Sequence, residues 1–99
     1  MTDLAVAAST FPFLYSDSGL DALKRLKRLG FDRYEMMIFP PHCWPAEMSA
    51  EDRRAIGAWL GDTGGRITSF CYPLLDNNPN GVDRLMRRYT LDRYREAID

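Results

Sequence analysis

The chain has 99 residues, of which 45% are hydrophobic and 27% are charged, and its formal net charge is −1. These values predict one small globular domain and argue against a general polyanion-binding protein, which carries a basic surplus. No apolar run reaches transmembrane length, and no basic lead-in typical of a signal peptide opens the chain. We therefore expect a cytoplasmic protein that binds neither nucleic acid nor membrane. The spacing of Cys43 and Cys71 fits no disulfide framework or zinc site, which predicts two free thiols.

Three strand-and-helix pairs are predicted along the chain. The first strand is the apolar run at residues 4–9, and a loop follows over residues 13–18. Ser16, Asp17 or Ser18 is expected to cap the next helix. Gly30 is expected to stop that helix. The helix presents an apolar stripe made of Leu20, Leu23, Leu26 and Leu29.

The second pair surrounds the chain's single histidine. A strand over residues 34–39 is stopped by Pro40 and Pro41, because proline lacks the N–H that a strand ladder needs. His42 lies in the loop that follows, and residues 49–52 resemble a capping box. The helix beyond it is expected to end near Gly64 and to bury Ala55, Ile56, Trp59 and Leu60.

The third pair begins with a strand over residues 66–72, which is rich in β-forming residues and is stopped by Pro73. Residues 74–81 are dense in turn formers and are predicted to form a loop. A helix is expected to begin near Val82 or Asp83 and to continue to Asp99. Units of about thirty residues that alternate strand and helix predict a parallel sheet of βα units.

Each predicted strand ends in an aromatic residue followed by proline, and the longer loops follow the strands rather than the helices. The loops at the C-terminal edge of a parallel sheet are where such folds bind ligands. Aromatic faces combined with carboxylate, imidazole and amide groups suit a small, neutral, hydroxyl-rich ligand. A well-packed cap on an α/β core has a similar composition and stays an alternative. The candidate substrate-binding residues are Phe11, Tyr15, Glu35, His42, Trp44, Tyr72 and Asn77.

Glu35 is the candidate with the most specific chemical argument, because it is a carboxylate within an apolar strand. Alternation along the strand places it in a segment that is largely apolar on both faces, so its carboxylate needs a partner there. One interpretation is an ion pair or hydrogen bond within the sheet, and the other is a role in holding a metal or substrate.

His42 is a candidate substrate contact or an ordinary loop histidine, because no second metal ligand lies at a useful spacing. Cys71 is expected to form part of the pocket wall, since no His or Lys can be assigned as the partner of a nucleophile.

In order along the chain, five segments resemble the N-terminal portion of the xylose isomerase-like TIM barrels, the sugar phosphate isomerase/epimerase group. They are residues 9–11 (STF), 28–32 (RLGFD), 34–36 (YEM), 67–70 (ITSF) with the Asn-bearing loop after them, and 94–99 (YREAID). The resemblance implies an α/β fold in which residues 1–99 form a single partial TIM-barrel domain. That domain would comprise three successive βα units of a (β/α)8 barrel, with parallel strands and an incomplete barrel.

The resemblance also implies an enzyme that uses a divalent metal (Mn, Mg, Co or Zn) to move a proton or hydride next to a sugar carbonyl. In the family the metal ligands come mainly from later strands, so neither a metal ligand nor a catalytic residue is assigned in this chain. Glu35 matches an acidic position near the end of the second strand, and His42 lies in a loop that borders substrate in relatives. The chain is therefore expected to contribute pocket wall and to be inactive alone.

A complete barrel of this type needs about 250 residues. We therefore expect a piece of a longer protein that needs the remainder of the barrel, or a homo-oligomer, for stability. The alternative is a non-catalytic small α/β binding or interaction module. A nucleic-acid-processing role, as in the abasic-site endonuclease branch of the family, is disfavoured because the basic residues lie on predicted helices beside acidic ones.

Overall fold

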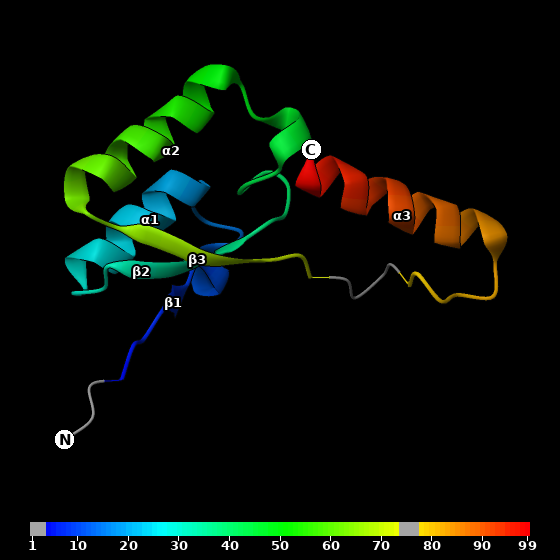
Figure 1. The fold of residues 1–99 in the computed structure, drawn as a ribbon, viewed down its shortest axis with the longest axis horizontal. Coiled ribbons are helices and arrows are strands. Elements are labelled where there is room, and N and C mark those ends of the chain that lie inside the picture. The colour runs from blue at the N-terminus through cyan, green and yellow to red at the C-terminus, as the bar shows by residue number, and fades with distance from the viewer. Residues whose placement is uncertain (1–3, 74–77) are drawn as a thin grey trace.

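The computed structural model describes residues 4–73 and 78–99. Three strands, β1 (Ala8–Ser9), β2 (Arg33–Met37) and β3 (Arg66–Cys71), form a parallel sheet in the order β1-β2-β3. The helices α1 (Gly19–Arg28), α2 (Ala50–Thr63) and α3 (Arg84–Ile98) each follow one strand (Figure 1). The predicted alternation of strands and helices and the parallel sheet are confirmed.

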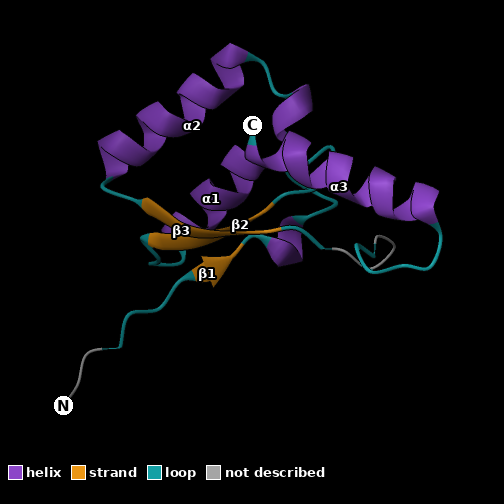
Figure 2. Ribbon diagram, turned by 45° about the vertical axis from the view of Figure 1, so that its right-hand side comes forward, coloured by secondary structure: helices purple, strands orange, loops and turns teal. Residues whose placement is uncertain are grey.

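Helices α1 and α2 both lie on one face of the sheet (Figures 1 and 2). Period-two alternation turns Tyr34 and Met36 of β2 toward them, and both side chains are fully buried against Leu23 and Leu26 of α1. From α2, the half-buried side chains that pack on this core are Ile56, Trp59 and Leu60.

Two residues that were expected in the helix stripes are exposed instead. Ala55 lies at the edge of the α2 stripe and is exposed. Leu29 is the C-cap of α1 and is 68% exposed, because the helix has already ended there.

Local signals place the helix ends where they were predicted. The Ser18 side chain caps α1 by accepting from the Asp21 N–H, and Ser49 with Asp52 forms a complete capping box at the start of α2. Gly30 and Gly64 follow the two helices with positive φ values of 100° and 68°, a conformation that side chains with a Cβ rarely adopt.

Strand β1 is shorter than the predicted run at residues 4–9. The Thr10 backbone N–H continues the ladder by donating to the Glu35 carbonyl (3.0 Å), and the Thr10 side-chain Oγ1 accepts from the Met37 N–H (3.0 Å). A side chain therefore replaces the backbone carbonyl at the end of this edge strand, where the chain turns into the short 3-10 helix η1 (Phe11–Phe13).

A β-bulge interrupts the pairing of β2 with β3. Tyr34 pairs with Ile67, but the next residue, Glu35, pairs with Ser69, so Thr68 is the extra residue. The Thr68 hydroxyl donates to the Tyr34 carbonyl (3.2 Å). As a result Ser69 shares a face with Glu35, whereas Phe70 faces the helices beside Met36.

The loop after β2 closes on itself. Phe39 and Cys43 exchange two backbone hydrogen bonds of 2.8 and 2.9 Å, and the peptide bond between Pro40 and Pro41 inside the loop is cis. The short 3-10 helix η2 (Pro45–Glu47) then leads to α2. Neither 3-10 helix was predicted, because each spans only three residues.

Helix α3 extends away from the sheet and meets the rest of the molecule near its C-terminal end, beside η2 (Figure 1). There Trp44 Nε1–H donates to Glu96 Oε2 (3.3 Å). Nearer its start, Leu85 and Tyr89 are 72% and 52% exposed. The third helix thus follows its strand in chain order without covering the sheet as α1 and α2 do. In the described part of the chain, no helix is long and apolar enough to cross a membrane.

Candidate functional site

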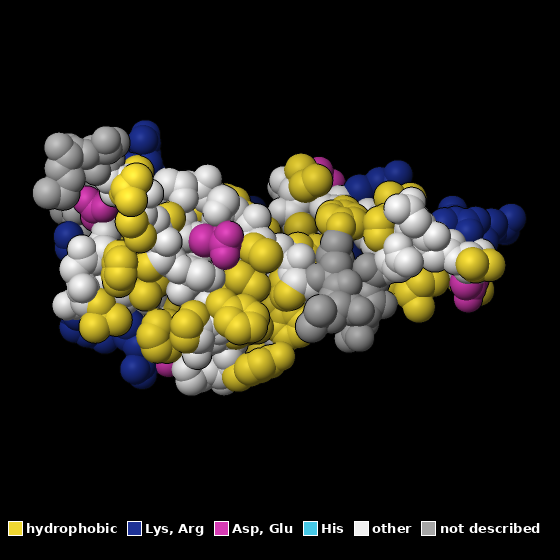
Figure 3. All heavy atoms as spheres, turned by 90° about the horizontal axis from the view of Figure 1, so that it is seen from below, with side chains coloured by type: hydrophobic (Ala, Val, Ile, Leu, Met, Phe, Trp, Pro, Cys, Tyr) yellow, Lys and Arg dark blue, Asp and Glu magenta, His cyan; other side chains and the backbone are white. Residues whose placement is uncertain are grey.

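The three parallel strands bring their C-terminal ends to one edge of the sheet. Phe11, Phe39 and Tyr72 follow β1, β2 and β3 respectively, so the predicted aromatic residues lie along the same edge. The sheet face opposite α1 and α2 is not covered by a helix, and hydrophobic side chains gather on that side of the molecule (Figure 3). The candidate site comprises this edge and the adjoining uncovered face.

Glu35 lies on the uncovered face at the centre of the sheet. Ser9 on β1 and Ser69 on β3 are its register partners, so three polar residues form a row across the strands. The Ser69 hydroxyl donates to Glu35 Oε2 (3.4 Å). Glu35 is half-buried rather than enclosed, because no helix packs on this side. The Glu35 carboxylate is therefore partnered by a hydroxyl of the neighbouring strand. A hydrogen bond within the sheet is one of the two interpretations drawn from the sequence.

Phe11 and Tyr15 present exposed rings close to this edge. Phe11 is 60% exposed and Tyr15 is 86% exposed. Tyr15 meets Phe39 edge-on, with ring centroids 6.2 Å apart. Such rings can cover the C–H face of a sugar without first giving up a tightly packed position in the core.

His42 is turned inward instead of toward solvent. It is 4% exposed, with Nδ1 at 2.7 Å from the Asp17 carbonyl and Nε2 at 3.0 Å from Thr10 Oγ1. A carbonyl only accepts, so Nδ1 carries a proton, and in the neutral ring the Thr10 hydroxyl donates to Nε2. Both ring nitrogens are thus bound by protein, and His42 holds the loops after β1 and β2 together.

Trp44 and Tyr72 belong to an aromatic cluster that anchors α3. Trp44 is 5% exposed, and its ring centroid lies 5.4 Å from that of Tyr72, which in turn lies 5.7 Å from that of Tyr94. The rings meet edge-on, so they pack on one another rather than forming an open stacking platform. This cluster shapes the edge of the sheet beside η2.

Asn77, the remaining candidate, lies outside the described residues. Among the residues that are described, no group of three His, Cys, Asp or Glu side chains is placed to hold a metal ion. Glu35 is a carboxylate on the uncovered face and could supply one oxygen ligand to a site completed by other residues.

Among the described residues, two groups have shifted pKa values, and both belong to the core on the helix side. Burial raises the pKa of the Cys43 thiol, and burial followed by the nearby Asp32 charge raises the pKa of Tyr34. Tyr34 remains a hydrogen-bond donor, to the Phe31 carbonyl at 2.8 Å. Cys71 is half-buried and pairs with Met37 on the uncovered side, and its place in a pocket wall stays a prediction.

Ser69 is the residue of the site that sequence reasoning missed. Strict alternation from Ile67 would place it on the helix side, and the bulge at Thr68 reverses that assignment. A pair of polar residues in the middle of an otherwise apolar strand is the signal that could have indicated a bulge.

No protein-family profile, characterised protein or solved structure matches this chain. Its function is therefore inferred from the fold and from the residues at the sheet edge.

Proposed function

We propose that this chain forms the wall of a carbohydrate pocket in a metal-dependent sugar or sugar phosphate isomerase or epimerase. In this proposal β1, β2 and β3 are the first strands of a (β/α)8 barrel. The observation that carries it is the layering of the sheet, with helices on one face and the Ser9–Glu35–Ser69 row on the other. The helix-free face of a βα sheet becomes the inside of a barrel, and the strand ends become its active-site edge.

The residues on this face suit a neutral sugar. The Glu35 carboxylate accepts hydrogen bonds from sugar hydroxyls, and the serine hydroxyls beside it can donate or accept. The exposed rings of Phe11 and Tyr15 cover C–H faces. Three of the predicted residues support this surface without contacting the sugar. His42 holds the loops after β1 and β2, and Trp44 packs on Tyr72 in the aromatic cluster. Asn77 stays a predicted polar contact.

A divalent metal (Mn, Mg, Co or Zn) is part of the proposal, and its ligands would come mainly from later strands of the barrel. Such an ion polarises the sugar carbonyl. Within this chain Glu35 is the carboxylate placed on the proposed inner face, and it orients a sugar hydroxyl or supplies one ligand. The two free thiols, Cys43 and Cys71, support a location in the reducing cytoplasm.

The test is a titration of the isotope-labelled chain with a neutral aldose and its polyol, followed by amide NMR. We expect dose-dependent shifts at Ser9, Glu35 and Ser69. Glu35→Gln should weaken binding about tenfold, because a charge-assisted hydrogen bond contributes about 1.5 kcal/mol. Glu51→Gln removes the same charge from the exposed first turn of α2 and should leave binding unchanged.

Shifts confined to the helices, or equal binding by the two variants, would contradict the proposal. The chain alone should also show no turnover with added Mn²⁺, Mg²⁺ or Co²⁺. Measurable isomerisation by the purified chain would contradict the assignment of a wall role.

A non-catalytic binding module is the second candidate, and the exposed apolar side chains of α3 favour it. A stable monomer that gives a dispersed amide spectrum and shows no sugar-dependent shifts on the uncovered face would support this candidate over the first.

A further inference from the structure

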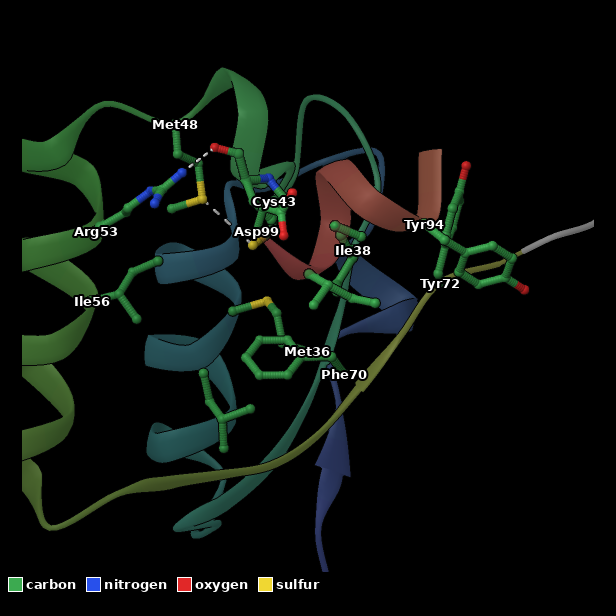
Figure 4. A pocket seen from close by; sticks show the side chains of 14 residues that line it. Met36, Ile38, Cys43, Met48, Arg53, Ile56, Phe70, Tyr72, Tyr94 and Asp99 are labelled. Carbon is green, nitrogen blue, oxygen red and sulfur yellow. Dashed lines mark hydrogen bonds between the residues drawn. The ribbon is translucent and has the colours of Figure 1, made fainter. Parts of the chain in front are cut away.

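A cavity of about 670 Å³ opens on the helix-covered side of the sheet, between α2, β3 and the end of α3 (Figure 4). It lies on the opposite side of the sheet from the Glu35 row of the proposed sugar site, because Met36 and Phe70 point away from Glu35 and Ser69. Tyr72, in the aromatic cluster at the edge of the sheet, also lines it. Its apolar lining includes Met36, Ile38, Met48, Ile56, Ile67 and Phe70.

The cavity has the size and character of a small-molecule site. Ligand pockets usually measure about 300–1,000 Å³ and combine an apolar lining with a few polar groups. Phe70 is 62% exposed although it lines the cavity, so a large apolar ring remains in contact with water. An apolar ligand that covers this ring gains the free energy of removing it from water.

Arg53 supplies the cation beside this apolar lining. Its side chain extends along the cavity next to Met48, and Nη2–H donates to the Pro45 carbonyl at 2.5 Å (Figure 4). The ion pairs found within the described ranges join Arg25, Arg93 and Arg95 to acids, and none of them involves Arg53. A guanidinium has five N–H donors, so the remaining ones can bind a carboxylate in a bidentate manner.

We propose that this cavity binds a free long-chain monocarboxylate, with its hydrocarbon tail against Ile56, Ile67 and Phe70 and its carboxylate on Arg53. Asp99 also lines the cavity, on the α3 side beside Cys43, and disfavours an anion there (Figure 4). The two charges therefore orient the ligand with its head toward α2. The proposal rests on this cavity alone and is independent of sugar binding.

The experiment measures the binding of dodecanoate and of dodecyltrimethylammonium, which share a tail and differ in the charge of the head. Calorimetry and amide NMR are used below the micelle concentration of each probe. We expect dodecanoate to bind more tightly and to shift the amides of Ile56, Ile67 and Phe70. Arg53→Gln should weaken dodecanoate binding about tenfold, as expected for the loss of a bidentate charged contact.

Arg54→Gln is the matched control, because it removes the same charge from the next residue of α2, which does not line the cavity. It should bind dodecanoate like the unmodified chain, and circular dichroism of both variants should show equal helix content. The proposal is overturned if dodecanoate does not bind, if the cationic probe binds equally well, or if the two variants behave alike. It is also overturned if sedimentation shows that a second copy of the chain covers the cavity and excludes dodecanoate.

Discussion

The Thr10 hydroxyl joins three parts of the chain that are far apart in sequence. It accepts from the Met37 N–H of β2 and contacts His42 Nε2 in the next loop, and the Thr10 side chain is fully buried. His42 in turn bonds the Asp17 carbonyl ahead of α1. One hydroxyl and one imidazole therefore position both loops that border the proposed sugar site.

Thr10→Val keeps the shape of the side chain and removes this hydroxyl. We expect the free energy of unfolding to fall by roughly 2–4 kcal/mol, because a buried donor and a buried acceptor both lose their partner. Thr10→Ser keeps the hydroxyl and loses a methyl group, so it should cost only about 1 kcal/mol. Urea unfolding of the two variants checks this, and equal losses would show that the hydroxyl network is not stabilising.

Ionisation of the buried Cys43 thiol makes the free energy of unfolding depend on pH in the alkaline range. Burial raises its pKa above the ordinary value of 9.0, so the folded state holds this proton more tightly than the unfolded chain does. Its contribution to stability is complete below pH 9 and is lost as the pH rises through the folded-state pKa.

Cys43→Ala should therefore lose stability less steeply above pH 9 than the unmodified chain does. Tyr34, whose pKa is also raised, is present in both proteins and cancels in the comparison. Urea unfolding between neutral pH and the alkaline limit measures the difference, and parallel pH profiles would rule out this linkage.

The role of His42 could not be decided from the sequence around it. A lone histidine beyond a strand end predicted either a substrate contact or an ordinary loop residue, and the structure places it inside the protein. Its two partners lie 25 and 32 residues away in the chain. No local pattern identifies partners at such separations, so the choice between the two interpretations needed the tertiary structure.

At the scale of elements, the start of α2 depends on a local device. The Ser49 hydroxyl accepts from the Asp52 N–H (3.0 Å), and the Asp52 carboxylate accepts from the Ser49 N–H (3.3 Å). This reciprocal arrangement satisfies two N–H groups that the first turn of a helix leaves without intrahelical partners.

Ser49→Ala should lower the free energy of unfolding by about 1 kcal/mol, the usual cost of losing an N-cap. Ser49→Asp should restore most of the stability, because a carboxylate also accepts at this position and interacts favourably with the helix dipole. Ser16→Ala, at an exposed serine that caps no helix, is the control and should stay near the unmodified value. A loss in Ser16→Ala equal to that in Ser49→Ala would contradict the assigned cap.

The elements that could be predicted are those whose boundaries are set locally. Serine caps and Gly30 define the ends of α1 and α2 within a few residues of sequence, and those predictions are confirmed. The extent of β1 and the bulge at Thr68 depend on which residues pair across strands, so they were not predicted. The position of α3 likewise depends on contacts with η2 that are remote in the chain.

At the scale of the whole molecule, the order and direction of the strands followed from the alternation of elements. A right-handed crossover through a helix makes consecutive strands parallel neighbours, and this rule needs no knowledge of side-chain packing. The candidate site residues that the structure describes do not line one pocket together. They divide among the uncovered face, a buried histidine network and an aromatic cluster.

The bulge at Thr68 determines which face of the sheet each later residue of β3 occupies. If β3 alternated strictly through this residue, Thr68 would pair with Glu35, and Ser69 and Phe70 would exchange sides of the sheet. The ring would then lie on the face of the proposed sugar site, and the Ser69 hydroxyl would lie in the apolar cavity. The bulged pairing at Thr68 thus puts the Ser69 hydroxyl on one face of the sheet and the apolar Phe70 ring on the other.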